Sequence, residues 1–138
     1  MQKMSKSDPS DLSRINLTDT PDQIRTKISK AVTDSTGSVT FDPENRPGVS
    51  NLVRIYATLT SWSCAKVCEH FSGRQTVDLK MELGEVLVET LSPAQRRLNE
   101  LLTKEQGHVE DTLASGRRKA RELAAAQLDR VKDVLGIV

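Results

Sequence analysis

The sequence predicts an all-α protein: a helical bundle of about six or seven helices, preceded by a flexible N-terminal signature loop. Two observations support this prediction. Apolar residues recur three or four positions apart along most of the 138-residue chain, which is the spacing of one face of a helix. Helix-start signals also recur before these runs, at residues 20–23 and 92–95. With 36% hydrophobic residues, the chain can build one modest core.

The first predicted helix is short and covers residues 9–15. Asp8 is a good N-cap residue, and Pro9 fits the first helical position. Leu12 and Ile15 lie three positions apart and would form its apolar side. The lysines that precede this helix are therefore expected on a loop.

The next helix has a clear start signal at residues 20–23, Thr-Pro-Asp-Gln, which form a capping box with proline at the first helical position. Apolar residues then recur at helical spacing, and the basic residues between them are expected on the outer side. The apolar residues are Ile24, Ile28, Ala31 and Val32, and the basic ones are Arg25, Lys27 and Lys30. A surface loop is predicted over residues 33–45.

Further helices follow this loop. A core-facing helix opens at Gly48 or Ser50, a short one begins at the cap Ser63, and a central core helix starts at Val77. The chain is expected to bend or restart at Pro93. A further helix starts at Thr103, Gly116 marks its end or a kink, and a last helix follows.

Composition excludes several classes of site. Twenty Lys and Arg residues balance nineteen Asp and Glu residues, so the net charge of +1 does not by itself predict a nucleic-acid-binding protein. No apolar run approaches the roughly 20 residues of a membrane span. Cys64 and Cys68 have no second pair to complete a zinc site, so we expect free, buried or half-buried thiols and no bound metal. Trp62 is expected to pack between helices, and His70 and His108 lie apart from any visible carboxylate or thiol group.

The most distinctive motif is Lys3, Met4, Ser5, Lys6 and Ser7, followed by Asp-Pro. Its side chains are too polar for a core, and the two ammonium groups can bind an anion such as phosphate. This string resembles the signature loop of class I aminoacyl-tRNA synthetases. Segments 17–24, 30–34 and 46–52 extend the resemblance to tryptophanyl-tRNA synthetases of the bacterial and mitochondrial type.

The resemblance implies a C-terminal part of such an enzyme, in which residues 1–16 end the missing nucleotide-binding domain and residues 17–138 form a helical, anticodon-binding type of domain. In that family the loop closes over ATP, which enters with Mg²⁺. The catalytic residues carried over are Lys6 first and Lys3 second, and Met4, Ser5 and Ser7 complete the ATP/pyrophosphate loop. The corner 46–51 could serve the nucleotide site, the tRNA or only the fold.

The resemblance also implies a tryptophan–tRNA ligase that uses tryptophan, ATP and tRNA(Trp), with its tryptophan pocket in the missing domain. A homodimer formed through that domain is expected, in the mitochondrial matrix or, alternatively, in the cytoplasm of a bacterium. The 138-residue piece alone is expected to be inactive. Two alternatives remain open: a non-catalytic helical module that binds tRNA or a protein, and a purely structural helical bundle.

The densest basic run consists of Arg117, Arg118, Lys119 and Arg121. The family's helical domain carries the anticodon-binding surface, so these residues are candidates for contact with the tRNA backbone. Alternatively, they form a solvated face and pair with nearby carboxylates, of which Glu110, Asp111 and Glu122 are the candidates.

Overall fold

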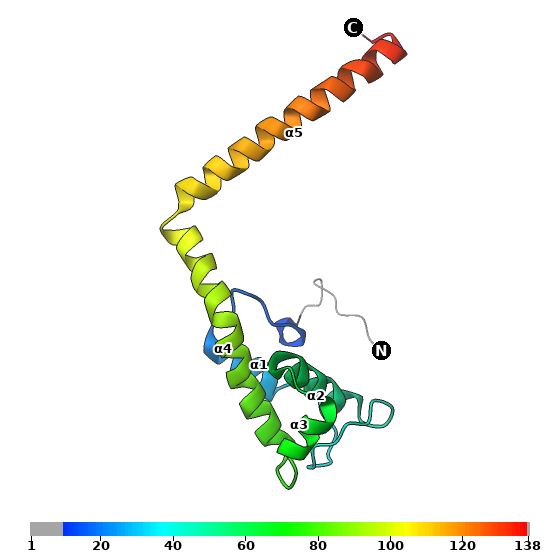
Figure 1. Cartoon of the computed structure of the whole chain (residues 1–138), viewed down its shortest axis with the longest axis vertical. Helices are drawn as coiled ribbons and strands as arrows, with labels where there is room; N and C mark the ends of the chain where they lie inside the picture. Colours follow the sequence, from blue (N-terminus) through cyan, green and yellow to red (C-terminus); the bar gives the residue numbers. More distant parts are fainter. Residues whose placement is uncertain (1–9, 138) are drawn as a thin grey trace. The chain divides into compact units, whose positions relative to one another are not determined.

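The computed structural model describes residues 10–137, and these residues form one 3-10 helix and five α-helices (Figure 1). In order they are η1 (Asp11–Ser13), α1 (Pro21–Ser29), α2 (Pro47–Thr60), α3 (Cys64–His70), α4 (Thr76–Thr103) and α5 (Gln106–Leu135). An isolated bridge between Ser38 and Gln75 is the only β pairing in this part of the chain. The all-α prediction is therefore confirmed, with fewer helices than expected.

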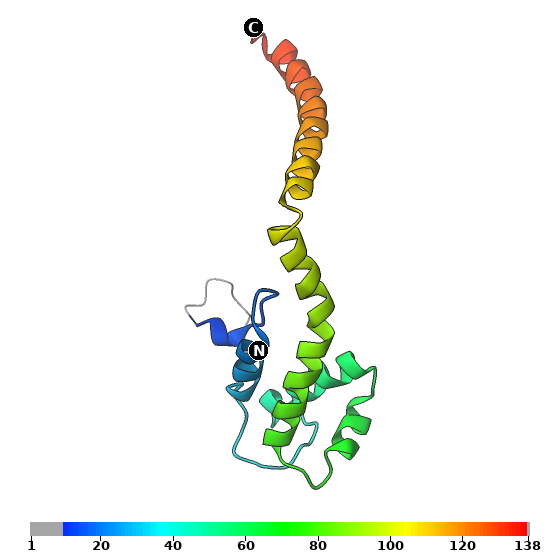
Figure 2. The ribbon, with the colours of Figure 1, turned by 90° about the vertical axis from the view of Figure 1, so that its left-hand side faces the viewer.

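The chain divides into two compact units, one that ends at Gln95 and one that begins at Arg96. In the first unit, α1, α2 and α3 gather around the first half of α4 (Figure 2). The fully buried side chains of this core include Ile24, Val49, Phe71 and Leu83. The predicted division after residue 16 remains a prediction.

Helix α1 begins as predicted and differs from the prediction further along. Thr20 accepts the Gln23 backbone N–H, and the Gln23 side chain accepts the Thr20 N–H, so the capping box is complete. The helix ends at Ser29, which leaves Val32 89% exposed instead of in the core. Lys27, predicted on the outer side, is only 6% exposed. Its position three residues after Ile24 places it on the buried face.

Helix α2 begins at Pro47, before both predicted starts at Gly48 and Ser50, because proline is suited to the first helical turn. Its predicted apolar stripe is confirmed, with Val49, Leu52, Val53 and Tyr56 all buried. Gly48 lies so close to the preceding loop that an added Cβ would be 2.5 Å from the Val32 carbonyl oxygen. Only glycine fits where α2 approaches the Val32 carbonyl so closely.

Helices α4 and α5 each join two predicted helices. Pro93 lies inside α4, and Gly116 lies inside α5, so the predicted restart at Pro93 and the predicted helix end at Gly116 are wrong. Proline removes one helical hydrogen bond, and glycine costs roughly 1 kcal/mol relative to alanine. Neither cost ends these helices, because many residues on each side continue them.

The second unit contains the end of α4 and all of α5. Arg97 bonds to Glu105 with its Nη1 and Nη2 atoms, 2.7 and 3.1 Å from the carboxylate oxygens, and so bridges the turn between the two helices. Exposed apolar side chains recur along α5, including Leu113, Leu128 and Leu135. Across the described residues, no helix has the length and apolar character needed to cross a membrane.

Candidate functional site

The signature residues Lys3, Met4, Ser5, Lys6 and Ser7 lie outside the described residues, as do Asp8 and Pro9. The described residues start at Ser10, and we call residues 10–19 the stem. Ser10, not Asp8, caps the short helix, since its hydroxyl accepts the Leu12 backbone N–H at 3.4 Å. The helix itself is the three-residue η1, which is shorter than predicted.

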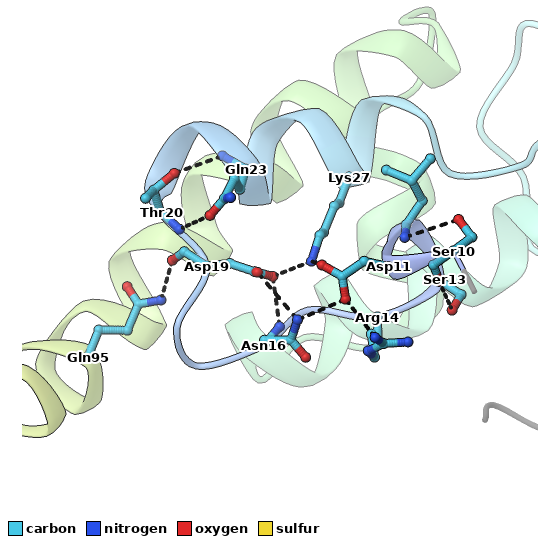
Figure 3. Close-up of polar contacts among 11 residues, drawn as sticks. Ser10, Asp11, Ser13, Arg14, Asn16, Asp19, Thr20, Gln23, Lys27 and Gln95 are labelled. Atoms are coloured by element: carbon cyan, nitrogen blue, oxygen red, sulfur yellow. Dashed lines mark hydrogen bonds and ion pairs between the residues drawn. The ribbon is translucent and has the colours of Figure 1, made fainter. Parts of the chain in front are cut away.

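Three charged side chains join the stem to α1, and we call them the charge cluster: Asp11, Asp19 and Lys27 (Figure 3). The Lys27 ammonium donates to Asp11 Oδ2 at 2.5 Å and to Asp19 Oδ2 at 2.7 Å. The Lys27 and Asp19 side chains are 7% and 6% exposed, whereas that of Asp11 is 49% exposed. One buried ammonium thus holds two carboxylates from opposite ends of the stem.

Asn16 and Arg14 complete the contacts of the cluster (Figure 3). The Asn16 side chain donates to Asp11 at 3.0 Å, and the Asn16 backbone N–H donates to Asp19 at 2.7 Å. Arg14 pairs with Asp11 at 2.9 Å through Nη2, while its Nη1 is buried without a hydrogen-bond partner. Gln95 in α4 donates to the Asp19 carbonyl at 2.9 Å, so the stem is also tied to α4.

Hydrogen bonding keeps the cluster ionised. The Lys27 ammonium, assisted by Asn16, lowers the pKa of Asp11. Burial tends to raise the pKa of Asp19 and to lower that of Lys27, but their mutual hydrogen bond and the other bonds of the cluster reverse both effects. Sequence reasoning missed this cluster, although Lys27 stands at core spacing between Ile24 and Ile28.

Arg46, the first residue of the corner 46–51, holds the loop that precedes α2. Arg46 donates to both carboxylate oxygens of Asp34, at 3.0 and 2.8 Å. Its guanidinium also donates to the Ser38 carbonyl, the Thr36 carbonyl and the Thr40 hydroxyl, at 2.6–2.8 Å. All three guanidinium nitrogens are thus occupied by the loop that precedes α2, and none is left for a ligand.

A second polar cluster surrounds Glu82 of α4. The Tyr56 hydroxyl donates to Glu82 Oε1 at 2.6 Å, and His70 Nε2 lies 2.9 Å from the same oxygen. Arg74 pairs with the other oxygen at 3.0 Å. The sequence suggested that His70 lies apart from carboxylates, and this contact shows that it does not. Trp62 packs with ring centroids 5.4 Å from His70 and 6.1 Å from Tyr56, which confirms its predicted packing role.

The four basic candidates Arg117, Arg118, Lys119 and Arg121 are all exposed on α5. Arg117, Arg118 and Arg121 line one shallow hollow together with Asp111 and Ser115. Arg118 therefore lies on the same side of α5 as Arg117 and Arg121. Within residues 10–137, none of the four forms an ion pair with a carboxylate.

The two cysteines and His108 do not belong to any cluster of potential metal ligands among the described residues. Cys64 and Cys68 are free and half-buried, as predicted, and burial raises the pKa of the Cys68 thiol. No three potential metal-ligating side chains gather anywhere in the described part of the chain.

The chain resembles known proteins along almost its whole length. A family described as "tRNA synthetases class I (W and Y)" matches residues 1–92. A tryptophan–tRNA ligase from Bacillus anthracis is 39% identical over 136 residues, and one from Brucella melitensis is 44% identical over 137 residues. These alignments cover 99% and 98% of this chain, but only 41% and 38% of the two relatives. The chain thus spans about two fifths of their length.

A solved structure is also similar to almost the whole of this chain. Tryptophanyl-tRNA synthetase from Mycoplasma pneumoniae superimposes with a TM-score of 0.69 at 29% identity, covering 99% of this chain and 41% of that one. The family match includes the signature residues, the stem, the charge cluster and most of the core. With residues 1–92 of 138 matched, the chain belongs to the class I tRNA synthetases of the tryptophan and tyrosine (W and Y) family.

Proposed function

We propose that this chain is the C-terminal part of a tryptophan–tRNA ligase, which activates tryptophan with ATP and transfers it to tRNA(Trp). The observation that carries the proposal is the 39–44% identity to tryptophan–tRNA ligases over nearly the whole chain. Identity that extends from the signature residues through the helical core does not favour a non-catalytic module or a purely structural bundle. The remaining parts of the enzyme, including the tryptophan pocket and the dimer contacts, would lie outside this chain.

The proposed chemistry depends on the two lysines of the signature loop. ATP, bound as its Mg²⁺ complex, is attacked by the tryptophan carboxylate, and pyrophosphate leaves with negative charge. An ammonium about 4 Å from that charge interacts with it by on the order of 4 kcal/mol at an effective dielectric constant of roughly 20. Lys6, and secondarily Lys3, would accelerate the reaction to the extent that this interaction is stronger in the transition state.

Tryptophan-dependent exchange between ATP and pyrophosphate tests the proposal. The full-length protein should catalyse exchange with tryptophan and not with tyrosine, the other amino acid of this family. The 138-residue chain should catalyse none, because it holds a single phosphate-binding loop of the site. Exchange with tyrosine, or exchange by the short chain alone, would contradict the proposal.

A second proposed site is the basic surface of α5, where Arg117, Arg118, Lys119 and Arg121 would contact the tRNA backbone. Their exposure and their lack of ion pairs in the described chain support it. Phosphate contacts release counterions, so tRNA affinity should fall steeply with salt. Replacing Arg117 and Arg121 with glutamine should reduce this salt dependence more than replacing Lys119 alone. If both variants keep the wild-type salt dependence, the surface does not bind tRNA.

The compartment is part of the same proposal. A mitochondrial tryptophan–tRNA ligase from Dictyostelium discoideum is 36% identical over 135 residues, and bacterial relatives are 37–44% identical. We propose the mitochondrial matrix, with the cytoplasm of a bacterium as the alternative. Fractionation of the source cells, followed by detection with an antibody, distinguishes the two.

A further inference from the structure

We propose that Asp11, Asp19 and Lys27 position the signature loop for catalysis by fixing the segment that follows it on α1. The inference rests on the proposed function, and it assigns a role to three residues outside the signature motif. None of them would touch the substrate. They would act through Lys6, which precedes Asp11 by five positions.

The cluster is more than a surface ion pair. A lysine that is 6% exposed loses its hydration, and such burial is tolerated only when the ammonium is fully paired. Lys27 uses its charge to hold one carboxylate from each end of the stem. Asn16 donates to both carboxylates, and Gln95 fixes the Asp19 carbonyl from α4. The stem is thus attached to two helices of the core.

Attachment of Asp11 limits where Lys6 can be. Five residues span at most roughly 18 Å when fully extended, and Asp11, at the end of this span, is fixed on α1 by Lys27. Rate enhancement by positioning depends on such restraint, and a displacement of about 1 Å can cost on the order of 100-fold in rate. Release of Asp11 would remove the restraint without changing either signature lysine in the sequence.

The test uses Asp11→Asn in the full-length protein. Asp11 is the half-exposed member of the cluster, and Lys27 keeps Asp19 as its partner when Asp11 loses its charge. Lys27→Met is less informative, because it would leave the buried Asp19 carboxylate without its cation and could unfold the unit. Asp22→Asn is the matched control, since Asp22 lies in the first turn of α1, pairs only with the exposed Arg25, and has a 94% exposed side chain.

We expect Asp11→Asn to lower kcat for tryptophan-dependent exchange by at least about tenfold, with KM for tryptophan unchanged within about twofold. Asp11→Glu should recover part of the loss, and Asp22→Asn should behave as wild type. Hydrogen exchange should show faster exchange at residues 10–16 in Asp11→Asn, with α2 protected as before.

Three results separate the possible failures. If the wild-type protein shows no tryptophan-dependent exchange, the proposed function fails, and the positioning role fails with it. If the wild-type protein is active and Asp11→Asn keeps wild-type kcat, only the positioning role is wrong. If Asp11→Asn loses protection in α2 as well as in the stem, the cluster stabilises the whole unit, which also overturns the positioning role.

Discussion

Substitution of Gly48 by alanine should destabilise the protein, although alanine is the better helix former. The new Cβ would lie 2.5 Å from the Val32 carbonyl oxygen and 3.4 Å from the Thr33 Cα. The first distance is roughly 0.8 Å shorter than an ordinary carbon–oxygen contact of about 3.3 Å. Such overpacking costs about 1–3 kcal/mol, against roughly 0.5–1 kcal/mol gained from helix propensity. The midpoints of these two ranges leave a net loss of about 1 kcal/mol.

Gly84→Ala in α4 is the matched control, because the same change meets only ordinary contacts, 3.7 Å from Arg25 Cα and Cγ. It should stabilise the same unit by roughly 0.5–1 kcal/mol. Urea unfolding can be followed by the fluorescence of Trp62, which is the single tryptophan and is half-buried in that unit. If Gly48→Ala proves as stable as wild type, or if both variants lose the same stability, the close approach does not explain this glycine.

Three further predictions concern individual charges. Lys6→Ala in the full-length protein should lower the activation rate on the order of 100-fold or more, with little change in tryptophan affinity. Lys6→Arg should restore the rate only partly. Equal losses in rate and affinity would argue against the mechanism. Arg46 lowers the pKa of Asp34 to about 2, so this pair should stabilise the fold above the ordinary value of 3.8 and lose its effect as pH falls from about 4 to about 2. Acid unfolding of Asp34→Asn should therefore be less steep in that range, and an unchanged profile would contradict this. Burial and the Glu82 hydrogen bond raise the pKa of the single tyrosine, Tyr56, to about 12. The midpoint of its ultraviolet titration should therefore move toward 10 in Glu82→Gln. An unshifted midpoint would show that Glu82 does not raise the pKa of Tyr56.

Features that depend on local sequence could be predicted. The capping box at Thr20 and Gln23, the Ser63 cap and the apolar stripe of α2 need only neighbouring residues, and all three are confirmed. The signature residues could be recognised by composition and order, without knowledge of the fold. The fold class follows, because the helical period repeats over most of the chain.

Features that depend on tertiary contacts could not be predicted in the same way. Lys27 was assigned to the outer side because lysine is rarely buried, and its burial depends on Asp11 and Asp19 from a separate segment. Arg46 finds its partners in the folded loop before α2. The continuation of α4 through Pro93 depends on the stability of the helix on both sides. The rule that proline breaks a helix considers only the proline and its neighbours, so it does not predict this continuation.

Charging of tRNA(Trp) by the full-length protein tests the central claim most directly. With labelled tryptophan, ATP and Mg²⁺, the protein should form tryptophanyl-tRNA, and labelled tyrosine in its place should give none. Omission of ATP should abolish the product, because the amino acid must first be activated. Formation of tyrosyl-tRNA, or no charging with tryptophan by a folded full-length protein, would contradict the assignment.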